Sequence, residues 1–275
     1  MTLDLRTTVH PVTRVTGRSA VRIDDRIAVE RPLAIEVGGR ALAVTLRTPG
    51  HDRELTLGFL AAEKVIRARA DVVHAAERLG TCAEESDTIE IELAAGVALD
   101  WSNLERHFAS TSACGLCGRA HLDSLRAGLT AMPPGEPFDP VALLELPARM
   151  RAAQEAFTAT GGIHGAAWCD ASLDVHVLRE DVGRHNAVDK VCGWLLEAGR
   201  YPAPAGVLWV SGRAGAEIVL KAARARIPVL VAVGAPSSLA VELAVAARMT
   251  LIGFLREGRM NIYCGAERVT GAGIA

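Results

Sequence analysis

The sequence predicts an α/β protein with a smaller β-rich N-terminal domain of α+β character and a larger α/β domain whose central sheet is covered by helices. Three observations predict this fold class. The chain has 275 residues, which suits two domains at about 150 residues each. Half of the residues are hydrophobic and only 4% are aromatic, so the core is aliphatic. Strand patterns prevail in the first half, and strands alternate with helices in the second.

The expected domain boundary lies in the segment 131–140, AMPPGEPFDP, because its proline and glycine content is typical of a surface connection. We therefore place the N-terminal domain at residues 1–130 and the α/β domain at residues 131–275. Pro140 is expected to open a short helix after this connection, and Pro147 a second helix that reaches about residue 158.

The N-terminal domain is expected to contain a hairpin, a helix and a further strand. Gly38 and Gly39 separate two weakly alternating segments and can adopt the positive φ angles of a two-residue hairpin turn. Asp52 follows the hairpin and can cap a helix whose apolar residues share one face. The predicted elements are strands over residues 33–37, 41–46 and 88–93 and a helix over residues 53–66.

Three apolar strands alternate with two helices in the C-terminal half. Strands that are apolar throughout belong to a sheet covered on both faces, and parallel pairing is the simplest arrangement for this order of elements. Ser237 or Ser238 can cap the second of these helices. The predicted strands span residues 206–211, 228–233 and 250–254, and the predicted helices span residues 216–226 and from the serine cap to residue 249.

Charge and hydropathy exclude several classes of protein. The chain carries 30 Lys and Arg against 32 Asp and Glu, a net charge of −2, whereas binding nucleic acid through bulk charge needs a basic excess. Residues 1–18 lack the apolar core of a signal peptide, and the most apolar stretch, residues 229–235, is too short to span a membrane. We therefore expect a cytoplasmic protein without a membrane partner, whose six cysteines are reduced thiols.

A pair of thiols at Cys-x-x-Cys spacing, Cys114 and Cys117, lies in a segment rich in serine, threonine and glycine. A helix is expected to begin just after it, and a helix N-terminus together with Arg119 and His121 favours a thiolate over a thiol. The thiolate is the form that acts as a nucleophile. This segment is therefore the first candidate for chemistry.

Three interpretations of this pair stay open on pattern alone. Structural zinc takes four ligands, but only Cys114, Cys117 and His121 are close in sequence. In a thioredoxin-type redox protein the cysteine pair directly follows a strand. No convincing strand precedes Ser110, where this segment begins, so the redox interpretation is weakened. In the third, one cysteine carries a sulfur atom as a persulfide and the other thiol helps to release it.

Two polar segments are further candidates. The segment 160–167, TGGIHGAA, contains His164, and an isolated turn histidine of this kind is most simply a hydrogen-bonded structural residue. Ala166 stands where a zinc deaminase needs glutamate, so deaminase chemistry lacks its general acid and base. The segment 179–190 concentrates Arg, Asp, His and Asn at a strand-to-helix junction, which is more typical of a site than of a solvated helix start.

Two glycine-containing loops, residues 212–215 and 234–238, each connect a parallel strand to a helix. Such loops expose backbone N–H groups and the positive ends of helix dipoles, which suit phosphates. Arg213, Arg256 and Arg259 add positive charge near them. These features suggest an anionic ligand such as a nucleotide, and ordinary surface arginines remain nearly as good an explanation.

Taken together, these segments resemble the FdhD family, the accessory sulfurtransferases of formate dehydrogenase. The resemblance covers the chain from about residue 33 to residue 268, and its pieces occur in the family's order. The matching segments are CGLCG (114–118), TGGIHGAA (160–167), EDVGRHNAVDK (180–190), SGRAGAEIVLKAA (211–223), GAPSSLAVELA (234–244) and GFLREGR (253–259).

The resemblance implies a fold and a set of partners. The larger domain would be cytidine-deaminase-like, and the protein would be a cytoplasmic homodimer. It would receive sulfur from a cysteine desulfurase and pass it to the bis(molybdopterin guanine dinucleotide) form of the molybdenum cofactor, which formate dehydrogenase requires. No permanently bound metal is expected.

The resemblance also implies site residues. Cys114 would carry the persulfide and Cys117 would be its partner. The guanine dinucleotide end of the cofactor would contact Phe254, Leu255, Arg256, Glu257, Gly258 and Arg259. Two alternatives are a non-catalytic carrier of the molybdenum cofactor and a zinc-stabilised nucleotide-binding module. The other cysteines, Cys82, Cys169, Cys192 and Cys264, match no family motif and are expected to be buried small hydrophobic residues.

Overall fold

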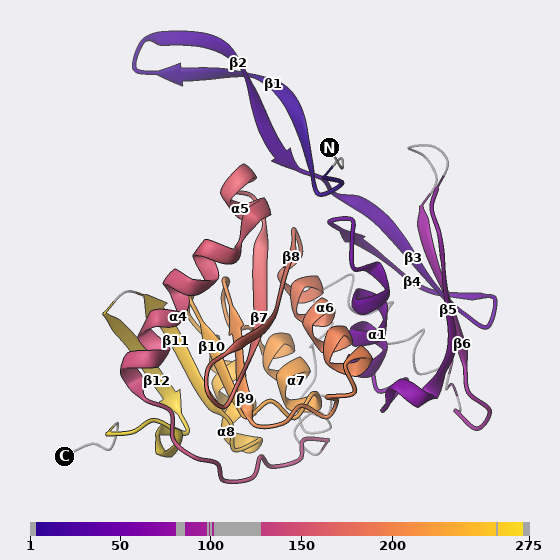
Figure 1. Ribbon diagram of the computed structural model, residues 1–275, viewed down its shortest axis with the longest axis vertical. Helices are drawn as coiled ribbons and strands as arrows, with labels where there is room; N and C mark the ends of the chain where they lie inside the picture. The colour runs from indigo at the N-terminus through magenta and orange to yellow at the C-terminus, as the bar shows by residue number, and fades with distance from the viewer. Residues whose placement is uncertain are drawn as a thin grey trace.

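The structure of the protein is a computed structural model that describes residues 4–80, 86–97, 99, 101, 128–256 and 258–271. Its described strands form a six-stranded sheet, a four-stranded sheet and a two-stranded arm that projects from the body of the molecule (Figure 1). Helices pack on both larger sheets. The predicted α/β class is confirmed.

The six-stranded sheet has the order β12-β11-β10-β9-β7-β8. The parallel pairing predicted for the three apolar strands is confirmed, because β9, β10 and β11 pair in parallel. The sheet continues at both edges with antiparallel strands that the sequence analysis did not predict. The strands are β7 (His164–Asp170), β8 (Val175–Asp181), β9 (Gly206–Val210), β10 (Val229–Ala232), β11 (Thr250–Arg256) and β12 (Arg259–Cys264).

Helices cover both faces of this sheet, as the fully apolar strands predicted. One face packs Trp168 and Leu208 against three helices, and the other packs Trp209 and Val231 against a single long helix (Figure 1). Ser237 is the cap of α8, since its side chain accepts a hydrogen bond from the backbone N–H of Ala240. The helices are α6 (Arg184–Glu197), α7 (Ala216–Arg224) and α8 (Ser238–Ala246) on the first face and α4 (Pro140–Ala153) on the second.

Pro147 does not begin a new helix, so that prediction is wrong. It lies inside α4, which Pro140 opens and Asp139 caps through the backbone N–H of Val141. The buried side chains of α4 lie on both sides of Pro147, and their packing against the sheet outweighs the backbone hydrogen bond that a proline removes. The next helix, α5 (Glu155–Thr160), follows after a break at Gln154.

The four-stranded sheet has the order β4-β3-β6-β5, and one face is covered by α1 (Asp52–Ala62). The predicted hairpin is confirmed, with φ angles of 57° and 75° at Gly38 and Gly39. The strands are β3 (Arg31–Val37), β4 (Arg40–Arg47), β5 (Val72–Arg78) and β6 (Asp87–Leu93), with short 3₁₀ helices η1 (Arg69–Asp71) here and η2 (Ala266–Arg268) near the C-terminus.

Asp52 does not cap α1, contrary to the prediction. His51 occupies the cap position without a side-chain hydrogen bond, and Asp52 is the first helical residue. The Asp52 carboxylate is buried against the Arg47 guanidinium, with 2.9 Å between Oδ1 and Nε, and Arg47 also binds Asp87. This tertiary ion pair links β4, α1 and β6, so the carboxylate is not available to the helix N-terminus.

The arm consists of β1 (Thr7–Thr16) and β2 (Ser19–Ala28), paired antiparallel over their whole length. It contacts α5 at its base, where Arg6 binds Glu155. The arm was not predicted, since nearly all of its residues are exposed and no burial pattern marks its strands. In the part of the chain that the structure describes, no helix has the length and apolar character needed to cross a membrane.

Candidate functional site

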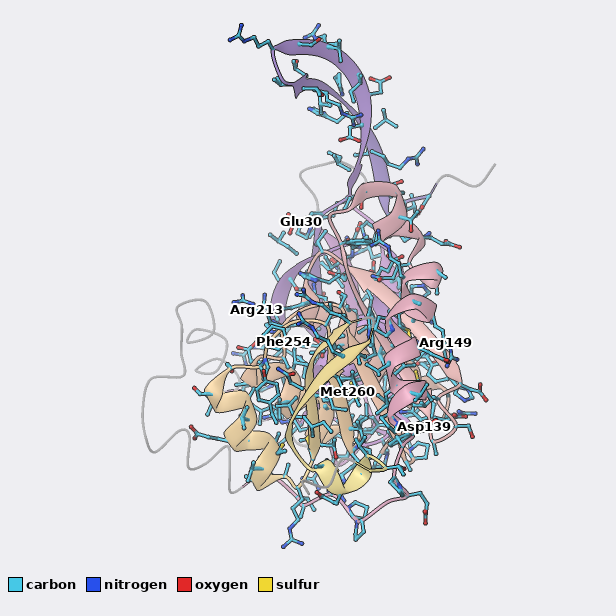
Figure 2. All side chains as sticks on the ribbon, turned by 90° about the vertical axis from the view of Figure 1, so that its left-hand side faces the viewer. Glu30, Asp139, Arg149, Arg213, Phe254 and Met260 are labelled. Carbon is cyan, nitrogen blue, oxygen red and sulfur yellow. The ribbon has the colours of Figure 1, made fainter. Side chains whose placement is uncertain are left out.

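The candidate site lies at the edge of the six-stranded sheet where the parallel strands β9, β10 and β11 end. The loops after β9 and β10 are joined by a hydrogen bond from the Gly234 N–H to the Gly212 carbonyl, 2.9 Å long. β7 and β12 begin at this edge because each runs antiparallel to its neighbour. Figure 2 shows Arg213 and Phe254 near each other here. Ligands bind at this edge in open α/β sheets.

Two adjoining cavities form a groove between this edge and the end of α4. The larger has a volume of about 870 Å³ and the smaller about 510 Å³. Both are lined by Pro147, Arg151 and Val233, so they lie next to each other. We call the larger the arginine cavity and the smaller the aromatic cavity.

The arginine cavity is positively charged. Arg151 of α4, Arg256 at the end of β11 and Arg259 at the start of β12 line it, and its described lining contains no Asp or Glu. Guanidinium groups bind phosphate oxygens in a bidentate geometry. The arrangement therefore suits an anionic ligand, particularly one with phosphate groups.

The aromatic cavity is lined by Phe157, Ile163 and Trp209 together with polar side chains. The Arg151 guanidinium lies over the Phe157 ring, 4.0 Å from its centroid. Gln154 also lines this cavity. The aromatic cavity thus combines flat apolar surface with a few buried polar groups.

His164 and Ser211 form the polar end of the aromatic cavity. The Ser211 hydroxyl oxygen lies 3.4 Å from His164 Nδ1 and accepts a hydrogen bond of 2.9 Å from the Gly165 N–H. Burial lowers the pKa of His164 below its ordinary value, and the positive charge of Arg184 lowers it further. The imidazole is therefore neutral at pH 7, and the Ser211 hydroxyl can donate its proton to Nδ1.

The predicted cofactor-binding segment lies at the arginine cavity. Phe254 has a φ of 52°, in the left-handed region that non-glycine residues rarely adopt, within the bulge where β11 and β12 lose register. Gly258 forms the following turn with a φ of 76°, and Glu257 lies outside the described residues. The members of the segment that line the cavity are Leu255, Arg256 and Arg259.

The two predicted catalytic residues, Cys114 and Cys117, lie outside the described residues, as do Cys82 and His121. Among the described residues, no group of three or more His, Cys, Asp or Glu side chains could hold a metal ion. Of the predicted site residues, the structure therefore describes only Phe254, Leu255, Arg256, Gly258 and Arg259.

The segment 179–190 has a structural role that the sequence did not reveal. The Glu180 carboxylate accepts hydrogen bonds from the backbone N–H groups of Ala156 and Phe157, 2.9 and 2.8 Å long. Arg179 binds Glu54 of α1. The carboxylate of Glu180 thus caps α5 and fixes one wall of the aromatic cavity.

Asp181 and Lys190 join the two larger sheets. Their side chains are buried and form an ion pair of 2.8 Å. Lys190 also donates to the Thr48 carbonyl, 2.9 Å away, and Asp181 accepts from the Thr48 N–H at 3.2 Å. Asn186 donates to the carbonyl of Leu46. These groups hold the end of β4, so they are not free to bind a ligand.

Arg184 and His185 lie at the start of α6, close to His164. Burial lowers the pKa of His185 to about 4, although the carboxylate of Glu217, 3.3 Å away, opposes this. The Arg184 charge lowers the pKa of both histidines. The imidazoles of His164 and His185 are therefore both neutral at pH 7.

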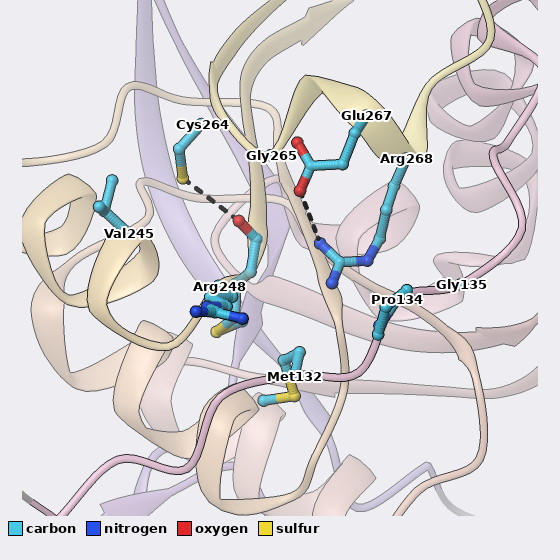
Figure 3. Close-up of a pocket in the computed structure, with 10 residues that line it drawn as sticks. Met132, Pro134, Gly135, Val245, Arg248, Cys264, Gly265, Glu267 and Arg268 are labelled. Atoms are coloured by element: carbon cyan, nitrogen blue, oxygen red, sulfur yellow. Dashed lines mark hydrogen bonds and ion pairs between the residues drawn. The ribbon is translucent and has the colours of Figure 1, made fainter.

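Three cysteines lie in the described part of the chain. Cys169 and Cys192 are buried, as expected, and burial raises the pKa of each thiol to about 12. Cys264 is only partly buried, contrary to the prediction, and its thiol donates to the Met249 carbonyl. It lines a cavity of about 330 Å³ at the opposite edge of the sheet, together with Arg268 (Figure 3). The buried Arg268 donates a hydrogen bond to the Pro133 carbonyl.

The sequence analysis missed the residues that α4 and α5 contribute to the groove. Arg151, Gln154 and Phe157 line the cavities, but none of them belongs to a motif. The sequence around these three residues looks like that of an ordinary surface helix, so it gives no sign of a site. They reach the site only because α4 packs across the sheet and ends at its ligand-binding edge.

Comparison with known proteins gives concordant results. A profile of the FdhD/NarQ family matches residues 28–270. A protein of Mycolicibacterium paratuberculosis named sulfur carrier protein FdhD is 47% identical over 264 residues, which are 94% of this chain and 97% of the relative. A protein of Streptomyces coelicolor with the same name is 43% identical, with 94% of each chain covered.

A solved structure has a similar fold. It is the crystal structure of a protein from Desulfotalea psychrophila described as a formate dehydrogenase accessory protein, with a TM-score of 0.75 and 22% identity. The similarity covers 96% of this chain and 99% of that one. At this identity the comparison shows the fold alone.

Proposed function

The chain belongs to the FdhD/NarQ family, and on this premise we propose that it is a sulfur carrier protein that serves formate dehydrogenase. The observation that carries the proposal is the similarity over 94% of the chain to proteins named sulfur carrier protein FdhD. The predicted thiol pair supplies the chemistry that such a carrier needs, since a thiolate can accept and release sulfur.

The proposed reaction has two steps. In the first, a cysteine desulfurase transfers a sulfur atom to the Cys114 thiolate, which becomes a persulfide. In the second, the Cys117 thiolate attacks the Sγ of Cys114, so that a disulfide forms and the terminal sulfur leaves as hydrosulfide to bind molybdenum. The two thiols are oxidised and the transferred sulfur is reduced, and a thiol reductant then restores the pair.

The substrate that receives the sulfur is the bis(molybdopterin guanine dinucleotide) form of the molybdenum cofactor. The arginine cavity fits the anionic end of this substrate because Arg151, Arg256 and Arg259 face a space of about 870 Å³. Its pyrophosphate groups are the ligands that guanidinium groups bind best. We also propose that the protein acts in the cytoplasm as a homodimer.

Intact mass spectrometry tests the carrier step. The protein is incubated with a cysteine desulfurase and cysteine, and the wild type is expected to gain the mass of one sulfur atom. Cys114→Ala is expected to gain none while it still binds GDP, and Cys264→Ala, a matched control at a thiol remote from the groove, is expected to behave as the wild type.

Other results of this experiment would favour one of the two alternative functions, the non-catalytic carrier or the zinc-stabilised module. An unmodified wild type that binds GDP favours the non-catalytic carrier. Stoichiometric zinc that is lost on substitution of Cys114 or Cys117 favours the zinc-stabilised module. Retention of the added sulfur by Cys114→Ala contradicts the role of Cys114.

A further inference from the structure

The arm presents a row of apolar side chains on one of its faces. Val12 pairs with Ile23, and Val21 and Ile27 share their face because residues two positions apart on a strand point the same way. Val21 is 52% exposed and Ile27 is 41% exposed. A two-stranded hairpin is only marginally stable in water by itself, and exposed apolar patches mark interaction sites. The arm therefore indicates a surface that covers it.

The four-stranded sheet has an apolar patch on the face that points away from α1, which we call the outer face. Figure 1 shows α1 on one face of this sheet and no other described helix on the opposite one. Val44 and Leu46 of β4 lie on the outer face and are 67% and 56% exposed. Ala34 pairs with Val44 and Pro32 with Leu46, so the apolar patch extends across β3.

The arm and the outer face carry opposite charges. Arg14, Arg18 and Arg22 lie in the distal half of the arm, residues 13–22, which contains no Asp or Glu. Glu90 and Glu92 of β6 lie on the outer face and are exposed. Complementary charge directs association and suppresses wrong partners, so the basic part of the arm suits the acidic part of the outer face.

The arm is held away from the outer face of its own chain. Arg6, at the base of the arm, binds Glu155 at 3.0 Å and lies 3.7 Å from the Glu180 carboxylate. Both strands of the arm also contact α5. These contacts direct the arm toward the side of the six-stranded sheet, whereas the outer face lies on the far side of the four-stranded sheet (Figure 1). A second molecule can bring the two surfaces together.

We propose that the arm of one copy packs on the outer face of a second copy, and that the second copy returns its own arm in the same way. Such an exchange is closed and two-fold symmetric, since each copy gives one arm and accepts one. An arm of two strands is about 10 Å wide and a face of four strands about 19 Å wide, so the arm fits on the face. Glu36 and Arg78, which also lie on this face, bind each other. The inference gives an interface to the homodimer of the proposed function and rests on that part of it alone.

Charge reversal tests the contact in the full-length protein. One variant has an acidic arm and carries Arg14→Glu, Arg18→Glu and Arg22→Glu. The other has a basic outer face and carries Glu90→Arg and Glu92→Arg. Analytical ultracentrifugation is expected to show a wild-type dimer. Each variant alone is expected to raise the dimer dissociation constant at least about tenfold, because like charges then meet at both contacts.

A mixture of the two variants gives the decisive measurement. In a mixed dimer the acidic arm meets the basic face, and the unchanged basic arm meets the unchanged acidic face. An equimolar mixture is therefore expected to recover the wild-type dissociation constant. Two variants that were merely misfolded would not rescue each other. A mixture that stays as dissociated as its components would overturn the proposal.

Val44→Asp tests the apolar part of the contact. It is expected to weaken the dimer about tenfold, because it buries a charge in the interface. Val245→Asp in α8 is the matched control, since Val245 is 56% exposed and lies outside both surfaces, and it is expected to dimerise as the wild type does.

Two further results would overturn the proposal. One is a monomeric wild type. The other is a dimer that neither the charge variants nor Val44→Asp weaken, which would assign the homodimer to a different surface. Failure of this test is distinguishable from failure of the proposed function, because the loading of sulfur on Cys114 is measured separately.

Discussion

Gly58 of α1 lies directly against the backbone carbonyl of Asp189 in α6, with no space for a side chain between them. Gly193 of α6 lies in the same way against the carbonyl of Glu54 in α1. The two glycines let the helices cross at close range, so that α1, which covers the four-stranded sheet, packs on α6, which covers the six-stranded sheet. Lys190 and Asp181 then fix the end of β4 beside this crossing.

Gly58→Ala is expected to destabilise the protein by about 3 kcal/mol or more, because its Cβ would overlap the Asp189 backbone, which cannot move without shifting α6. The measurement is the free energy of unfolding in urea. Gly135→Ala is the matched control, since a Cβ at Gly135 meets nothing within 4 Å, and it is expected to change the stability by less than about 0.5 kcal/mol. Equal stability of the two variants would contradict the close helix crossing.

Lys190→Met is expected to destabilise the protein by about 3–5 kcal/mol, because it leaves the Asp181 carboxylate buried without its cation. The double variant Lys190→Met with Asp181→Asn removes both charges and is expected to recover part of the loss. Chemical denaturation of both single variants, the double variant and the wild type measures the coupling. A double variant less stable than the sum of the single effects predicts would refute the pairing.

His185 is expected to contribute a loss of stability as the pH falls from about 6.5 to about 4. The pKa of His185 is lowered to about 4 in the folded protein, whereas it is about 6.5 in the unfolded chain. Between these values the unfolded chain binds a proton that the folded protein does not, so acid favours unfolding.

Thermal unfolding between pH 7 and pH 4.5 tests this expectation. His185→Gln is expected to reduce the slope of stability against pH, while His10→Gln, on the exposed arm, is expected to keep it. If His185→Gln keeps the wild-type slope of stability against pH, His185 does not cause the loss of stability in acid.

Cys169 and Cys192 are expected to resist alkylation in the native protein, because burial raises the pKa of both thiols to about 12 and leaves almost no thiolate at pH 7. Peptide mass spectrometry after a short exposure to iodoacetamide measures this. Both thiols are expected to react fully in denaturant. Rapid native alkylation of either one would contradict its burial.

Several elements could be predicted because their residues carry strong local signals. The glycine pair at 38–39, the proline at 140 and the fully apolar strands β9, β10 and β11 each have one favourable local structure, so hairpin, helix start and covered parallel sheet were all predicted. The family motifs also pointed to Arg256 and Arg259, which line the arginine cavity.

Which polar residues line the groove and which bind other parts of the protein depends on tertiary packing. Asp52 looked like a helix cap, and Glu180, Asp181 and Lys190 looked like part of a site, but partners in other elements of the protein occupy all four. Gln154 belongs to no motif and joins the groove because α4 packs across the sheet. A hydrogen bond or ion pair between side chains of different elements leaves no periodic trace in a sequence, because its energy depends on packing rather than on helix or strand periodicity.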